Sequence, residues 1–269
     1  FTPGGQAKGD VKSMRFAVPT RGQEDPVYNT VDSMPNTIAG HHTSIAEVLG
    51  GVGYVSGRFG KWHLGDNLQG FNVSSANGKP GVVGRKFYGN IDVAEKLTDA
   101  AVEFIEQNRK KPFFLYVAHW DVHGPLRARK DVVAKYKKKL ETYKDDGDWE
   151  WNPIYAAMLD AVDTSVGRMR AKIQHAGLAK NTLFVFTSDN GGASFATTNR
   201  PLRGAKGAFF EGGIRVPTCA AWPAVIKPGT RSDAALTSVD FMPTFAELAG
   251  ASPPANQPVD GRSFTGVLQ

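Results

Sequence analysis

Several residue types that bind anions or transfer protons stand directly after apolar runs in this sequence. Lys61 and His63 follow one such run, Asp189 and Asn190 follow another, and Lys206 lies in a glycine-rich segment. A lysine can hold an anionic oxygen, and a histidine can move a proton near neutral pH. Each residue taken alone is more often structural than functional, so any chemistry depends on the fold bringing them together.

The pair Asp189-Asn190 offers a carboxylate and an amide oxygen side by side. Calcium and magnesium bind such hard oxygen ligands, although calcium takes about six to eight of them. Asp-Asn-Gly-Gly is also strong turn chemistry, so these residues alone leave both a metal site and a turn open.

A second polar group follows the apolar run that starts at Pro112. It consists of His119, Asp121 and His123. A lone histidine is more often structural than catalytic, and the same caution applies to both histidines. Further charged residues, Arg203 and Arg215, stand in or beside the glycine-rich segment 193–213.

Apolar periodicity predicts the elements that would position these residues. Ser44 and Glu47 form a capping-box pattern at the start of a helix. We expect helices at about 44–50, 92–109, 130–144, 153–175 and 238–248, and strands at about 54–59, 112–118, 182–187 and 216–222, of which 112–118 and 182–187 read as buried.

Strands that alternate with helices predict an α/β fold with a mostly parallel sheet and helices on both faces. Ligand sites in such sheets lie beyond the carboxyl ends of the strands, where the polar groups fall here. We expect one domain over 1–269, in which 1–42 is an irregular segment that wraps the surface and 66–90 is a loop.

Composition narrows the classes of partner. The chain has 269 residues and a net charge of +6, and no apolar stretch reaches the length of a membrane span. The basic run Lys135–Lys139 fits a solvated helix face, and no nucleic-acid motif accompanies it. The one cysteine, Cys219, stands in an apolar run and reads as a buried core residue.

The wording and order of the motifs together resemble the sulfatase family, which belongs to the alkaline phosphatase superfamily. The resemblance covers about residues 43–269. It is carried by Gly60-Lys-Trp-His-Leu-Gly65, Ala118-His-Trp-Asp-Val-His-Gly-Pro125, Phe186-Thr-Ser-Asp-Asn-Gly-Gly192, Pro201-Leu-Arg-Gly-Ala-Lys206, Glu211-Gly-Gly-Ile-Arg-Val-Pro217 and Asp240-Phe-Met-Pro-Thr-Phe245.

The resemblance implies roles for six of these positions. Lys61 and His63 would contact a formylglycine nucleophile, with His63 as the base that helps expel sulfate. His123 and Lys206 would hold the sulfate and assist the leaving oxygen. Asp189 and Asn190 would be half of a calcium site, with magnesium as the other candidate.

Two parts of the family pattern are absent from this sequence. The family makes formylglycine from the cysteine of a Cys-x-Pro-x-Arg motif, and no such motif occurs. Ala17-Val-Pro-Thr-Arg21 has its spacing but alanine in place of cysteine. The resemblance therefore implies a fold incomplete at the N-terminus, without the first strand and its paired aspartates, and without the C-terminal subdomain. This chain by itself is expected to be inactive.

The resemblance implies a sulfuric ester hydrolase whose partner is a sulfated small molecule, such as an aryl sulfate, or a sulfated glycan. Two alternatives stay open: a phosphate or phosphonate ester hydrolase of the same superfamily, and a non-catalytic remnant that binds sulfated glycans. The family also implies a periplasmic, secreted or lysosomal location.

Overall fold

The computed structural model describes residues 13–14, 34–35, 38, 41–62, 64, 68–75, 90–142, 151–255 and 257–269. His63, Ala17–Arg21 and most of the segments 1–42 and 66–90 lie outside these residues, so the predictions made for them stay predictions. Within the first 42 residues the structure describes two short strands, β1 (Ser13–Met14) and β2 (Met34–Pro35), which pair antiparallel.

The centre of the molecule is a parallel sheet in the order β4-β3-β5. Strand β3 (Val55–Gly60) pairs along its whole length with β5 (Phe113–Ala118), and on its other side with β4 (Val73–Ser74). Strand β6 (Phe184–Thr187) pairs antiparallel with β7 (Thr218–Ala221) in a separate sheet.

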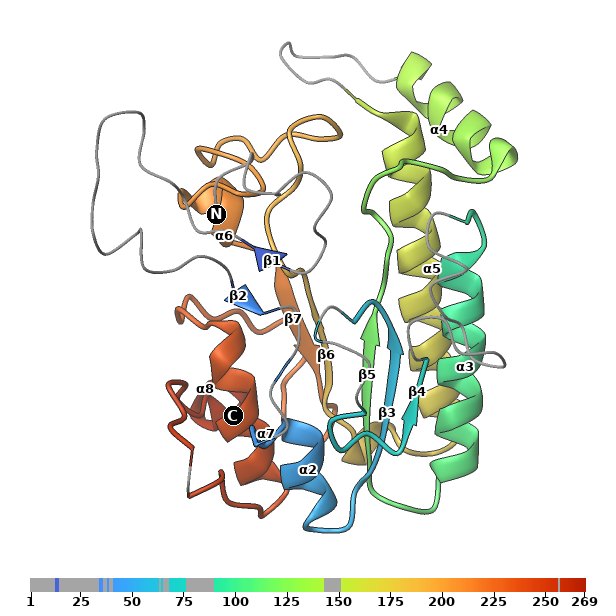
Figure 1. Cartoon of the computed structure of the whole chain (residues 1–269). Coiled ribbons are helices and arrows are strands. Elements are labelled where there is room, and N and C mark those ends of the chain that lie inside the picture. Colours follow the sequence, from blue (N-terminus) through green and yellow to red (C-terminus); the bar gives the residue numbers. More distant parts are fainter. Residues whose placement is uncertain are drawn as a thin grey trace, which may run out of the picture.

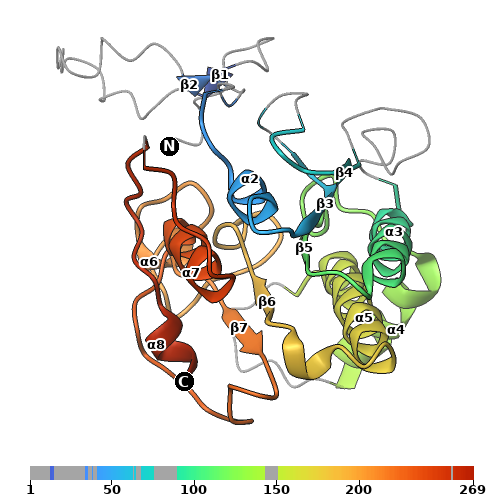
Figure 2. The ribbon, with the colours of Figure 1, turned by 90° about the horizontal axis from the view of Figure 1, so that it is seen from below.

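Helices cover both faces of the parallel sheet (Figures 1 and 2). Helix α3 (Val93–Asn108) packs on one face, where the Phe104 ring meets Phe59 of β3 edge to face. Helix α5 (Pro153–His175) lies against α3, and α4 (Lys130–Thr142) lies against α5. Helices α2 (Ile45–Gly50) and α7 (Phe241–Leu248) lie on the opposite face.

The remaining elements are short. They are the 3-10 turns Ala179–Asn181 and Ser238–Asp240 and the helices α6 (Glu211–Ile214) and α8 (Thr265–Leu268). Among the described residues, no helix has both the length and the apolar character needed to cross a lipid bilayer.

The prediction of an α/β fold with a parallel sheet between helices is confirmed. The buried side of α3 is the predicted one, with Leu97, Ala101 and Ile105 fully inaccessible to solvent. The capping box is also present, since the Glu47 amide donates to the Ser44 hydroxyl at 3.2 Å and the Ser44 amide donates to the Glu47 carboxylate at 2.7 Å.

Three sequence predictions are wrong. Cys219 is exposed, because among the described strands β7 pairs only with β6, and Cys219 lines an open groove beside α5. Strands β5 and β6 are only partly buried, and Tyr116 of β5 is 45% exposed. The predicted loop 66–90 contains the strand β4.

Candidate functional site

Close backbone contacts bring the ends of β3 and β5 together. The Lys61 amide donates a 2.8 Å hydrogen bond to the Ala118 carbonyl. The two loops that follow β3 and β5 therefore begin side by side. Gly60 has φ of 104°, and a Cβ there would lie 1.9 Å from the Ala118 oxygen. Only glycine fits this approach without moving the backbone.

A second set of contacts joins the end of β6 to the glycine-rich segment 193–213. The Lys206 amide donates to the Gly192 carbonyl at 3.0 Å, and the Gly191 amide donates to the Gly213 carbonyl at 2.9 Å. The side-chain amide of Asn199 bonds both backbone groups of Gly192: its oxygen accepts from the Gly192 amide at 2.8 Å, and its nitrogen donates to the Gly192 carbonyl at 2.9 Å. Lys206 therefore lies next to the segment that carries Asp189 and Asn190.

Electrostatics link the two sets of contacts. Burial lowers the pKa of the Lys61 ammonium, the charge of Lys206 lowers it further, and the charge of Asp189 raises it. One charge shifts the pKa of another group measurably only when the two lie within about a Debye length, roughly 10 Å. The structure thus brings together two lysines and an aspartate that stand far apart in the sequence, with a local excess of positive charge.

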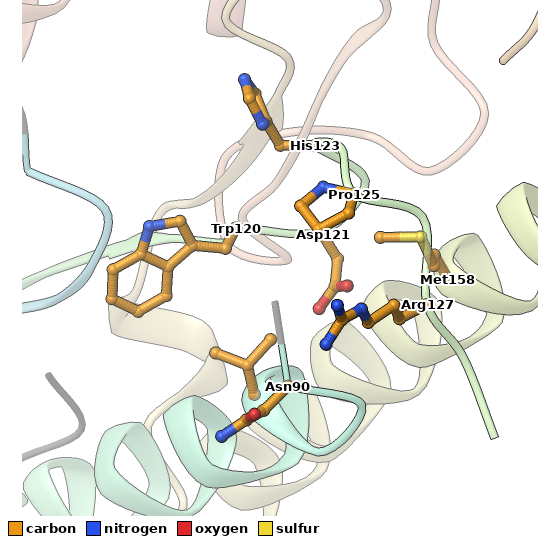
Figure 3. Close-up of a pocket in the computed structure, with 8 residues that line it drawn as sticks. Asn90, Trp120, Asp121, His123, Pro125, Arg127 and Met158 are labelled. Carbon is orange, nitrogen blue, oxygen red and sulfur yellow. The ribbon is translucent and has the colours of Figure 1, made fainter. Parts of the chain in front are cut away.

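His123 lies on the loop that follows β5 and is exposed. Its amide donates to the Trp120 carbonyl at 2.8 Å, and its Nδ1 lies 2.7 Å from the Gly124 oxygen. Figure 3 shows the His123 ring and the Asp121 carboxyl projecting from the loop in opposite directions. Asp121 and Asn90 are among the residues that line a water-sized pocket of about 10 Å³.

His119 has a structural environment, as the caution about lone histidines anticipated. Its Nε2 lies 3.1 Å from the Ser165 hydroxyl, which in turn accepts a 2.6 Å hydrogen bond from Thr98. Its Nδ1 is buried and has no hydrogen-bond partner. His119 thus links the loop after β5 to α5, and through Ser165 to α3.

The described residues do not make a complete calcium site. Asp189 and Asn190 are only two candidate ligand residues, whereas calcium takes about six to eight oxygen ligands. The side-chain amide nitrogen of Asn190 donates to the Gly191 carbonyl, which leaves its oxygen available. No cluster of three or more His, Cys, Asp or Glu side chains suited to a metal occurs in the part of the chain that the structure describes.

Sequence reasoning missed Arg58, which lies in the middle of β3 and is only 2% exposed. Its guanidinium carbon lies 3.6 Å from the centre of the Trp62 ring, and two of its nitrogens donate to Ser74 at 3.0 and 2.7 Å. Burial lowers the pKa of Arg58 to about 10. The sequence offered one signal for Arg58: it is a charged residue within the predicted strand that ends directly before Lys61.

Two partly buried titratable groups in the loop after β5, His119 and Asp121, predict that the stability of the fold depends on pH. Burial lowers the pKa of His119 to about 4 and raises the pKa of Asp121 to about 6. The unfolded chain binds more protons at His119 between pH about 6.5 and 4, so stability falls on acidification there, by on the order of 3 kcal/mol. Asp121 acts in the opposite sense, since the folded chain binds its proton more tightly between pH about 4 and 6.

We therefore expect Asp121→Asn to expose the His119 effect. Urea unfolding between pH 7 and 4 should show a steeper loss of stability in Asp121→Asn than in the unaltered chain. Adding His119→Gln to that variant should flatten the profile. Parallel pH profiles for the unaltered chain and Asp121→Asn would contradict this account of the loop.

Comparisons with known proteins identify a family for this chain. The family model described as Sulfatase matches residues 13–251. A protein named Sulfatase from Formosa agariphila is 37% identical over 192 residues, covering 66% of this chain and 34% of that protein. Mouse arylsulfatase G is 30% identical over 297 residues, covering 85% of this chain and 53% of the relative.

Among solved structures, Ps i-CgsB in complex with k-i-k-neocarrahexaose superposes with a TM-score of 0.73 at 28% identity. The match covers 96% of this chain and 62% of that one. The chain spans between a third and about half of the length of these two curated relatives. Because the family model covers most of the sequence in a matching fold, this chain belongs to the sulfatase family.

Proposed function

We propose that the protein to which this chain belongs hydrolyses sulfate esters, and that this chain supplies the cations that bind the sulfuryl group. The observation that supports this most strongly is the lowered pKa of Lys61, to which burial contributes most and the charge of Lys206 contributes next. An ammonium group whose pKa is lowered by burial and by a second cation gains a stabilising partner when an oxyanion binds beside it. Family membership supports sulfate as the anion.

The chemistry assigned to each side chain follows from its type and place. Lys61 and Lys206 neutralise charge that grows on the sulfuryl oxygens as the ester bond breaks. His123, an exposed imidazole on the loop after β5, is proposed to protonate the leaving oxygen. His63, which lies outside the described residues, is the family's candidate for the base that helps expel sulfate.

The nucleophile is proposed to come from outside this sequence. The one cysteine, Cys219, lies in β7 and has no Cys-x-Pro-x-Arg context. A formylglycine, when present, would supply a hydrated aldehyde that attacks sulfur. Asp189 and Asn190 are proposed as two of several calcium ligands, with magnesium as the other candidate. No step is assigned to either cation, because two donors do not complete its shell.

Two alternatives predict different results in one assay. A phosphate or phosphonate ester hydrolase of the same superfamily would prefer a phosphoryl group at the lysines. A non-catalytic remnant would bind sulfated glycans without hydrolysing them. The wording Gly60-Lys-Trp-His63 and the family match favour the sulfate ester hydrolase.

The test compares release of 4-nitrophenol from 4-nitrophenyl sulfate and from 4-nitrophenyl phosphate. We expect the 269-residue chain to bind inorganic sulfate but to release no 4-nitrophenol from either ester. A longer protein that carries this chain together with Cys-x-Pro-x-Arg should hydrolyse the sulfate ester faster. Turnover by the chain alone, or faster phosphate hydrolysis by the longer protein, would contradict the proposal.

A further inference from the structure

The loop that follows β6 presents large apolar side chains to solvent. The Phe195 side chain is 71% exposed, and Phe209 further along the same segment is 70% exposed. A single exposed aromatic is ordinary on a protein surface. Phe195 differs from an ordinary surface residue in how firmly it is held and in what lies beside it.

The backbone around Phe195 is well anchored. The Ala196 and Thr197 amides both donate to the Ala193 carbonyl, at 2.9 and 3.0 Å. The neighbouring residue Ala196 is only 5% exposed, so packing of its side chain against the protein also holds the turn in place. A ring presented on a fixed turn loses little conformational entropy when it contacts a ligand.

Phe195 is also placed beside the candidate site. A Cβ on Gly124 would lie 3.4 Å from the Cζ atom of the Phe195 ring, so the ring tip rests on the residue next to His123. Further along the same segment, the Lys206 amide donates a hydrogen bond to the Gly192 carbonyl, so Lys206 also lies near the start of this segment. One segment thus carries both a cation assigned to the sulfuryl group and an aromatic ring beside the residue assigned to the leaving oxygen.

We propose that Phe195 is a substrate-binding residue that stacks against the ring of the alcohol to which the sulfate is attached. This inference rests on the proposed function. The leaving oxygen joins the sulfuryl group to the alcohol, so a ring next to His123 lies on the alcohol side of the ester bond. An aryl ring and the C–H face of a sugar both pack on a phenyl ring, so the shared chemistry is a ring-bearing sulfate ester.

The experiment measures the affinity of three probes by isothermal titration calorimetry with the full chain. Inorganic sulfate has no ring, phenyl sulfate has an aryl ring, and glucose 6-sulfate has a sugar ring. We expect Phe195→Ala to weaken at least one ring-bearing probe by about tenfold, from the lost stacking and burial, and to change inorganic sulfate by less than about twofold. The probe that weakens identifies the ring. Phe209→Ala, an equally exposed ring in the same segment, should leave all three affinities unchanged.

The outcomes separate this inference from the proposed function. If Phe195→Ala weakens all three probes equally, or none, the ring is not a contact for the alcohol and the inference is overturned. If no probe binds the unaltered chain, the proposed function fails and the inference with it. Thermal unfolding of Phe195→Ala should match the unaltered chain, because a side chain so exposed contributes little to stability.

Discussion

Replacing Lys206 by alanine is expected to weaken the binding of inorganic sulfate by about tenfold to a hundredfold. A hydrogen bond to a charged group contributes about 1.5–3 kcal/mol, and Lys206→Ala removes one such donor together with its charge. Lys61→Ala should have a similar effect. In a longer, active protein, either change should lower kcat by about a hundredfold or more, because the lost charge acts most strongly on the transition state.

The same variant provides a check that does not depend on function. The charge of Lys206 contributes to the lowered pKa of Lys61, so Lys206→Ala should raise the Lys61 pKa toward its ordinary value. An NMR titration of the lysine side chains measures this directly. Lys138→Ala on the exposed helix α4 is the matched control, because it removes the same charge elsewhere. A sulfate affinity reduced equally by Lys138→Ala would indicate a general charge effect and contradict a site.

Replacing Arg58 by alanine is expected to lower the free energy of unfolding by about 2–4 kcal/mol. The side chain is buried, and its loss leaves a cavity between Trp62, Phe71 and Ser74. Arg58→Met fills most of that space without burying a charge, so it should cost less than about 1.5 kcal/mol. Urea unfolding of both variants measures the difference.

Arg58→Met also tests whether this residue positions the candidate site. Its guanidinium lies against Trp62, the residue after Lys61, and thereby orients the segment that leaves β3. We expect Arg58→Met to remain folded but to bind sulfate several-fold more weakly. Loss of stability in Arg58→Met equal to that in Arg58→Ala, with sulfate affinity unchanged in the folded fraction, would assign Arg58 a purely structural part.

Much of the architecture could be predicted because local signals agree with the tertiary contacts. The Ser44–Glu47 capping box predicts the start of α2, and the spacing of Val93, Leu97 and Phe104 predicts the buried side of α3. The short strand β4 gave no signal of its own, since a two-residue strand is defined by its pairing with Gly57 and Arg58. Sequence periodicity does not contain that information.

Burial was harder to predict than element type. Cys219 and Tyr116 lie in apolar runs that suggest a covered strand, yet both are exposed, because burial depends on which elements pack over a strand. The site shows the same limit. The residues around Lys61 and Lys206 could be named from motifs, whereas the supporting contact of Arg58 with Trp62 depends on side-chain packing.

The central claim is that the loop ends carrying Lys61, Gly192 and Lys206 bind one sulfate together. The most direct test is a backbone amide NMR titration of the full chain with inorganic sulfate. We expect saturable shifts with one common dissociation constant at these three positions, and little change along α4. Shifts concentrated on the Lys135–Lys139 run, or unequal constants at Lys61 and Lys206, would contradict the claim.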